Sequence, residues 1–170
     1  MTDDSHEAIS VVLTMGSDES SEIASAMTTP TQPLRVLYMD DDEMALTVTQ
    51  LQLMRAGIHM EATSDALEAV SIMTTQELDI ILLDSVMPTI DGVEFLQLMR
   101  SLQLAHPVVF LTGHGVEELR EATREFEVLG VLDKQADRLT LPDRLRELHA
   151  AYLSGDITMD PASGGHRAAS

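Results

Sequence analysis

Short apolar runs recur along the middle of the chain, separated by longer amphipathic stretches. Four runs have the length of a strand and stop at a polar residue: Leu34–Met39, Ile80–Leu83, Val108–Leu111 and Val128–Leu132. A fifth run, Ile58–Ala62, alternates apolar with polar positions, as an edge strand of a sheet does. These runs predict five strands.

The stretches between the runs carry apolar residues at helical spacing. The sets are Met44, Val48 and Leu51; Ala66, Ala69, Val70 and Met73; Phe95, Leu98, Met99 and Leu102; Leu119, Ala122 and Phe126; and Leu141, Leu145, Leu148 and Tyr152. Thr140, with Asp143 three residues on, predicts a capped start for the last helix. Strands that alternate with helices predict an α/β fold, a doubly wound five-stranded parallel sheet with five helices on its two faces.

Composition sets the expected domain boundaries. Residues 1–33 are rich in Ser, Thr, Asp and Glu, contain no Lys or Arg, and predict a flexible acidic tail. The apolar patch Ile9–Leu13 within it fits either a transiently ordered segment or a docking strand or helix. Residues 154–170 predict a second flexible tail, which leaves a folded domain at residues 34–153.

The charge narrows the classes of partner. The chain has 170 residues and a formal net charge of -19, which argues against a surface for nucleic acid or an anionic membrane. It has no cysteine, which excludes disulfides, thiolate metal sites and a cysteine nucleophile. No apolar run approaches the ~20 residues of a membrane helix, and the charged start of a signal peptide is missing. We therefore expect a cytoplasmic protein that binds a basic partner surface or a cation.

Polar residues follow the predicted strands at their carboxyl ends, where a parallel α/β sheet builds its sites. They are Asp40, Asp41 and Asp42 after the first strand, Asp84 after the third, Thr112 after the fourth and Lys134 after the fifth. Each alone is typical of a turn, a helix N-cap or a solvated charge. Their convergence on one end of one sheet predicts a functional site.

The residue types predict the chemistry of that site. Clustered carboxylates repel one another unless a cation neutralises them, and Mg²⁺ prefers such hard oxygen ligands. A carboxylate can attack phosphorus to form an acyl phosphate, and an ammonium can neutralise the phosphoryl charge. Lys134 is the only lysine among ten basic residues. Its position after the fifth strand predicts that the site needs a compact ammonium charge, which the planar guanidinium of arginine does not replace.

Four segments together resemble the markers of response-regulator receiver domains of two-component signalling. They are "VLYMDDDE", "DIILLDSVMPTIDG", "VVFLTG" and "VLDK", which occur in the family's order and with its spacing across residues 34–153. The resemblance implies a flavodoxin-like sheet of order 2-1-3-4-5. It also implies that Asp84 is the phosphoacceptor and that Mg²⁺ is bound by Asp40, Asp41, Asp84 and the backbone carbonyl of Val86.

The resemblance assigns roles to the remaining strand ends as well. Thr112 would contact the phosphoryl group, and Lys134 would be the family's lysine. Gly113 would leave the phosphoryl group room to enter, and His114 would border the site. The phosphoryl donor would be a histidine kinase or a histidine phosphotransfer protein.

Two positions depart from the family pattern. Receiver domains usually have proline after the lysine, often with a cis bond, where this chain has Gln135. A cis bond before a non-proline residue costs roughly 2.5–4 kcal/mol, which favours a trans bond and a differently shaped loop. Receiver domains also usually have an aromatic switch residue three positions before the lysine, where this chain has Val131.

Two alternative functions remain open on the sequence alone. A phosphatase of the haloacid-dehalogenase type would use Asp40 as its nucleophile, since Asp40 and Asp42 have the D-x-D spacing. An interaction module would keep the receiver fold without accepting phosphate. The favoured hypothesis is a phosphorelay protein. We expect it to be a monomer or weak homodimer and to lack a DNA-binding output domain. It would catalyse only its own phosphorylation and dephosphorylation.

Overall fold

The computed structural model describes residues 32–156, so the predicted tails lie almost wholly outside the described residues. The elements are β1 (Arg35–Met39), α2 (Glu43–Arg55), β2 (His59–Thr63), α3 (Ala66–Thr75), β3 (Ile80–Leu83), α4 (Gly92–Ser101), β4 (Val108–Thr112), α5 (Val116–Ala122), β5 (Gly130–Asp133) and α6 (Leu141–Ser154). The five strands form one parallel sheet in the order β2-β1-β3-β4-β5. The predicted fold class, sheet order and edge strand are confirmed.

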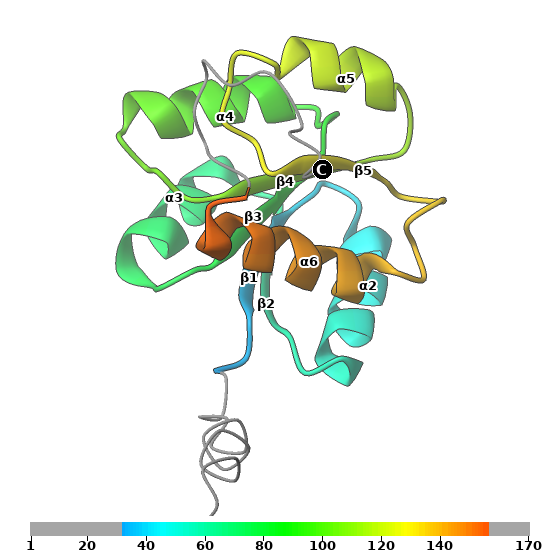
Figure 1. Cartoon of the computed structure of the whole chain (residues 1–170). Coiled ribbons are helices and arrows are strands. Elements are labelled where there is room, and N and C mark those ends of the chain that lie inside the picture. The colour runs from blue at the N-terminus through cyan, green and yellow to red at the C-terminus, as the bar shows by residue number, and fades with distance from the viewer. Residues whose placement is uncertain (1–31, 157–170) are drawn as a thin grey trace, which may run out of the picture. The chain divides into compact units, whose positions relative to one another are not determined.

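Helices cover both faces of the sheet, with α4 and α5 on one side and α2 and α6 on the other (Figure 1). Alternate residues of β1 serve the two sides, because successive side chains of a strand point to opposite faces. Leu37 packs with Met73 of α3 and Phe95 of α4, whereas Tyr38 packs with Leu53 of α2. None of the described helices is long and apolar enough to cross a membrane.

Helix α2 forms as predicted, but it does not bury the apolar stripe that indicated it. Met44, Val48 and Leu51 are 71%, 38% and 46% exposed, and the helix instead buries Thr49 and Leu53. Both stripes have helical spacing, so periodicity does not distinguish them. The exposed stripe leaves apolar side chains on the solvent-facing surface of α2.

Two other helices differ from their predicted patterns. In α4, Leu96 is fully buried while Leu102 is the exposed C-cap residue. Helix α5 ends at Ala122, and the buried position next to it is Thr123, whose hydroxyl donates to the carbonyl of Leu119. Phe126 lies beyond that helix and still packs against the core.

The N-cap position predicted for α6 is confirmed, but the side-chain capping bond is absent. Thr140 occupies the N-cap position but makes no side-chain bond to the first turn. Its hydroxyl donates instead to the backbone carbonyl of Asp137, at 3.3 Å. Pro142 in the first turn lacks an N–H, so this helix start has one donor fewer to satisfy.

Candidate functional site

Three carboxylates meet where β1 and β3 end. Each of Asp40, Asp41 and Asp84 offers one oxygen, and these oxygens lie within 4.8 Å of one another. Met39 pairs with Leu83 across the two strands, so the residues that follow them meet side by side. Asp40 and Asp84 are only 1% and 5% exposed, while Asp41 is open to solvent. Hard oxygen donors of this kind suit Mg²⁺.

Lys134 reaches this cluster from the end of β5. Its Nζ lies 2.6 Å from Asp40 Oδ2 and 2.8 Å from Asp84 Oδ1. Burial alone acts to lower the pKa of the ammonium, but the hydrogen bonds and charges of Asp40 and Asp84 outweigh it and raise the pKa of Lys134. The lysine is therefore charged at neutral pH.

The pKa of Asp84 is also raised, which for a carboxyl group disfavours the charged form. Burial raises the pKa of the Asp84 carboxyl, and the nearby charge of Asp40 raises it further, against the lowering effect of Lys134. The backbone N–H of Val86 donates to Asp84 Oδ2 at 3.0 Å. The Val86 side chain itself is 76% exposed beside the acceptor. Asp84 is thus a carboxylate held away from water with one strong cationic partner.

The sequence reasoning missed Tyr38. Its hydroxyl is fully buried and donates to Asp40 Oδ2, the same oxygen that accepts from Lys134. Burial, followed by the hydrogen bond and charge of Asp40, raises the pKa of the Tyr38 phenol well above its ordinary value. Tyr38 is therefore a permanent donor that orients Asp40. The signal for it is the alternation of β1, which points residues 38 and 40 to the same face.

Thr112 lies at the end of β4 with its hydroxyl engaged by neighbouring loops. Thr112 Oγ1 donates to the carbonyl of His114 at 2.7 Å and lies 2.7 Å from the hydroxyl of Ser85. Ser85 was not singled out from the sequence. His114 contacts Thr112 through its backbone, while its side chain is exposed.

Gly113 borders the stem of Lys134. A Cβ added at Gly113 would lie 4.0 Å from Lys134 Cδ, an ordinary contact distance. The closest backbone approach lies elsewhere, at Gly92, where an added Cβ would come within 2.2 Å of the Asp84 carbonyl oxygen. Any larger residue at Gly92 would push the backbone that carries Asp84.

Asp42 stands apart from the carboxylate cluster. Its Oδ1 accepts from the backbone N–H groups of Met44 and Ala45, so it is the N-cap of α2. Its own N–H donates to Asp40 Oδ1 at 2.9 Å. Asp42 therefore starts the helix and supports Asp40 through the backbone.

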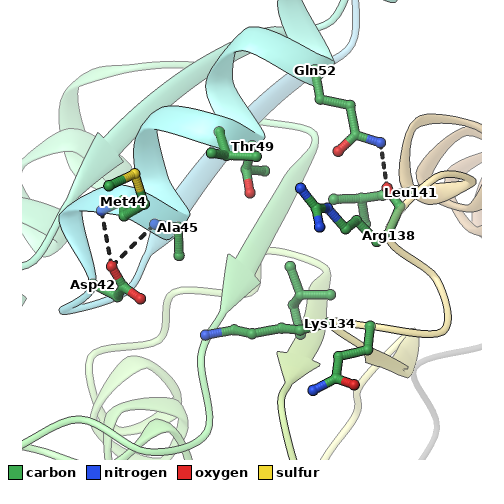
Figure 2. A pocket seen from close by; sticks show the side chains of 11 residues that line it. Asp42, Met44, Ala45, Thr49, Gln52, Lys134, Arg138 and Leu141 are labelled. Carbon is green, nitrogen blue, oxygen red and sulfur yellow. Dashed lines mark hydrogen bonds between the residues drawn. The ribbon is translucent and has the colours of Figure 1, made fainter.

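A groove of about 550 Å³ opens between α2 and the loop that precedes α6, beside Lys134. Figure 2 shows Met44, Thr49 and Gln52 on its α2 side, with Arg138 and Lys134 facing them. Gln135 also lines this groove, and the peptide bond between Lys134 and Gln135 is trans. The Gln52 side chain donates to the carbonyl of Arg138, which ties α2 to the loop.

Val131 occupies the position of the expected aromatic residue and is 5% exposed. It packs into the core on the side of α3, α4 and α5. Arg120 of α5 donates to the Val131 carbonyl at 3.4 Å. The side chain therefore already lies inward.

Comparison with known proteins agrees with this arrangement. The family model of the response regulator receiver domain matches residues 36–146. This chain belongs to the response regulator receiver domain family.

Relatives of this receiver domain include transcriptional regulators. The alkaline phosphatase synthesis transcriptional regulatory protein PhoP of Bacillus subtilis is 32% identical over 117 residues, which cover 68% of this chain and 45% of that protein. The two-component response regulator ARR10 of Arabidopsis thaliana is 30% identical over 68% of this chain and 20% of its own length. This chain therefore spans less than half of the length of either relative.

Solved structures show the same fold. The chemotaxis protein CheY4 of Vibrio cholerae matches with a TM-score of 0.62 and 25% identity over 68% of this chain and 98% of that chain. The response regulator TrrA of Thermotoga maritima, in complex with Mg²⁺ and beryllofluoride, matches with a TM-score of 0.59 and 19% identity over 68% of this chain and 98% of its own. The second likeness concerns the fold alone.

Membership of this family confirms the prediction that the chain is a receiver domain of two-component signalling. Receiver domains bind Mg²⁺ at an aspartate cluster and are phosphorylated by histidine kinases or phosphotransfer proteins. The predicted site residues Asp40, Asp41, Asp84 and Lys134 come together in space. Their individual roles, and those of Val86, Thr112 and Gly113, stay predictions.

Proposed function

We propose that this protein is a phosphoacceptor of a two-component relay and that Asp84 receives the phosphoryl group from a phosphohistidine. The observation that supports this most strongly is the ion pair between Lys134 and Asp84 beside the cluster of Asp40 and Asp41. In this proposal the chain catalyses only its own phosphorylation and the later loss of phosphate. Its output is a change in the binding of a partner protein.

The transfer exchanges one bond of phosphorus for another. A carboxylate oxygen of Asp84 forms a bond to phosphorus while the bond from phosphorus to the donor's imidazole nitrogen breaks. The electron pair of that bond returns to the imidazole. Lys134 keeps its charge near the new phosphoryl oxygens, and Thr112 turns its hydroxyl from the His114 carbonyl toward them.

Asp40, Asp41 and Asp84 are the side chains proposed to bind Mg²⁺, together with the carbonyl of Val86. The fit rests on three oxygens within 4.8 Å of one another, two of them on buried carboxylates that repel one another. Bound Mg²⁺ would supply neutralising charge for the carboxylates and the phosphoryl oxygens. Tyr38 and Lys134 bind Asp40 Oδ2, which leaves Oδ1 as its freer oxygen, with one backbone donor.

The exposed stripe of α2 suits contact with a protein donor. A donor histidine that reaches Asp84 must cover the rim of the site, where Met44 and Val48 line the groove beside Lys134 and are 71% and 38% exposed. Replacing both by Ser should slow transfer from a phosphorylated histidine phosphotransfer protein about tenfold, if each contributes about 0.5–1 kcal/mol of apolar contact. Phosphorylation by acetyl phosphate should stay unchanged, because this small donor needs no protein contact.

The phosphatase alternative has less support. Asp40 would have to act as nucleophile, yet it is 1% exposed and accepts bonds from Tyr38, Lys134 and the backbone of Asp42. The interaction-module alternative does not explain why the carboxylates of Asp40 and Asp84 are buried close together.

Mass spectrometry after incubation with acetyl phosphate and Mg²⁺ tests the proposal. We expect one added phosphoryl mass that is absent from Asp84→Asn, with the label on the peptide that contains Asp84. Label on Asp40 would favour the phosphatase, and the lack of any label with small or protein donors would favour the interaction module.

A further inference from the structure

Two aspartates close the turn that carries Lys134. Asp133, the last residue of β5, accepts at Oδ1 from the backbone N–H groups of Gln135 (2.7 Å) and Ala136 (2.8 Å). Asp137 Oδ2 accepts from the N–H of Asp133 at 2.8 Å, and the Asp137 N–H donates to the Asp133 carbonyl at 3.0 Å. The two residues bind each other's backbone in both directions and enclose Lys134.

The sheet holds Lys134 from the other side. The backbone N–H of Lys134 donates to the Thr112 carbonyl at 2.8 Å. With its backbone fixed by β4 and by the turn, the ammonium reaches Asp40 and Asp84 through the side-chain torsions alone. The bonds from Ala136 and Gln135 also lower the pKa of the Asp133 carboxyl, so the charged acceptor persists at neutral pH.

We propose that Asp133 and Asp137 are positioning residues for Lys134 and that they replace the proline found after this lysine in most receiver domains. The inference rests on the proposed function, since it concerns the same lysine. Asp133 needs the N–H of Gln135, and proline has none. The carboxylate turn and the family's proline therefore exclude each other in this chain.

This exclusion allows a sharp test with beryllofluoride, a phosphoryl analogue, and Mg²⁺. Gln135→Pro removes the N–H and the side chain, whereas Gln135→Ala removes the side chain alone. Asp133→Ala removes the acceptor, whereas Asp133→Asn keeps an acceptor oxygen. Affinities for Mg²⁺ alone and for beryllofluoride at saturating Mg²⁺ would be measured by calorimetry, with thermal unfolding to confirm that each variant is folded.

We expect Gln135→Pro to bind beryllofluoride about tenfold more weakly than Gln135→Ala, the change expected for one or two lost hydrogen bonds. Asp133→Ala should lose a similar factor, and Asp133→Asn should recover most of it. Affinity for Mg²⁺ should stay within about twofold of wild type, because the proposed metal residues lie outside the turn. A merely structural loss would weaken both ligands together.

Equal or tighter beryllofluoride binding by Gln135→Pro would overturn the inference, as would parallel losses of Mg²⁺ and beryllofluoride affinity in Asp133→Ala. A wild-type protein that binds no beryllofluoride would instead overturn the proposed function. The two failures are therefore distinguishable.

Discussion

Lys134 Nζ lies 2.8 Å from Asp84 Oδ1, although the two residues follow strands that are separated in the sheet by β4. The lysine stem crosses the end of β4 beside Gly113, where an added Cβ would be 4.0 Å from Lys134 Cδ. The same ammonium contacts Asp40 at 2.6 Å. One flexible side chain thus links the ends of β1, β3 and β5.

Lys134→Arg should impair this link. The guanidinium is planar and larger, so it does not fit the position of an ammonium between two carboxylates. We expect Mg²⁺ binding to persist and beryllofluoride affinity to fall about tenfold or more, because a charged hydrogen bond contributes about 1.5–3 kcal/mol. Calorimetry would measure both, with Lys134→Met as the variant that lacks the charge. Wild-type affinity in Lys134→Arg would mean that arginine serves equally well here.

Asp84→Asn should stabilise the metal-free protein at neutral pH. The pKa of Asp84 is raised in the folded state, so the folded protein binds this proton more tightly than the unfolded chain. Stability is therefore lost as the pH rises above the ordinary aspartate range through the raised pKa. The neutral amide avoids that loss, and each kcal/mol gained would raise Tm by about 2–8 °C.

Thermal unfolding in EDTA at pH 7 and pH 4 would measure this effect. We expect the difference between Asp84→Asn and wild type to shrink at pH 4, where wild-type Asp84 takes up a proton. A Tm for Asp84→Asn below wild type at pH 7 would show that the pair with Lys134 outweighs burial.

Asp41→Ala and Asp42→Ala should have different effects, the first mainly on Mg²⁺ affinity and the second mainly on stability. Asp41→Ala removes one charge from the cluster, so Mg²⁺ affinity should fall at least tenfold while the metal-free protein becomes more stable. Asp42→Ala removes the N-cap of α2, which should cost about 0.5–2 kcal/mol of stability. Its Mg²⁺ affinity should change only a few-fold. Titrations with Mg²⁺ and urea unfolding would measure both, and the reverse ranking would contradict the assignment.

The strands and their polar ends could be predicted because buried parallel strands leave continuous apolar runs, and parallel topology brings their carboxyl ends together. The buried face of α2 could not, because two stripes with helical spacing lie on one helix and only packing decides between them. Tyr38 resembled a core residue of β1. The bond from its hydroxyl to Asp40 appears only when the strand is folded beside the site.

The turn at Asp133 could likewise be predicted only in part from the sequence. Gln135 could be recognised as a departure from the family, because it replaces a residue with a fixed backbone angle. The hydrogen bonds of Asp133 and Asp137 are local, because the two residues lie four positions apart. Aspartates in loops are common, however, and the backbone N–H groups that donate to their carboxylates cannot be identified from the sequence.

Val86→Asn should shorten the lifetime of the phosphorylated protein. Hydrolysis needs a water opposite Asp84, and the Val86 side chain, which is 76% exposed there, offers no hydrogen bond to it. An amide would orient the water. One bond of about 0.5–1.5 kcal/mol in the transition state predicts about a two- to tenfold faster loss of phosphate. Decay of the phosphorylated mass would measure it against Val86→Ala, and a longer lifetime in Val86→Asn would contradict this account.

The last prediction concerns the output surface and follows from Val131. In receiver domains with the aromatic switch, the ring turns inward when the threonine moves toward the phosphoryl group. Val131 is already buried, at 5% exposure, and valine has one stiff torsion and little volume to fill a vacated space. A ligand shifts a two-state equilibrium only by its differential affinity for the two states. Val131 should therefore contribute little to a shift of the output surface between its two states.

Beryllofluoride binding should therefore change the backbone mainly near the site. We expect the largest amide chemical-shift changes at Asp84, at Thr112 and along residues 133–137, where the turn joins Lys134 to the ligand. Changes along α5 and α6 should be smaller, since Arg120 binds the Val131 carbonyl without contacting the site. Val131→Tyr supplies the aromatic ring and should extend the changes along both helices. Large changes along residues 114–131 and 141–152 in the wild-type protein would show that it switches fully without the ring.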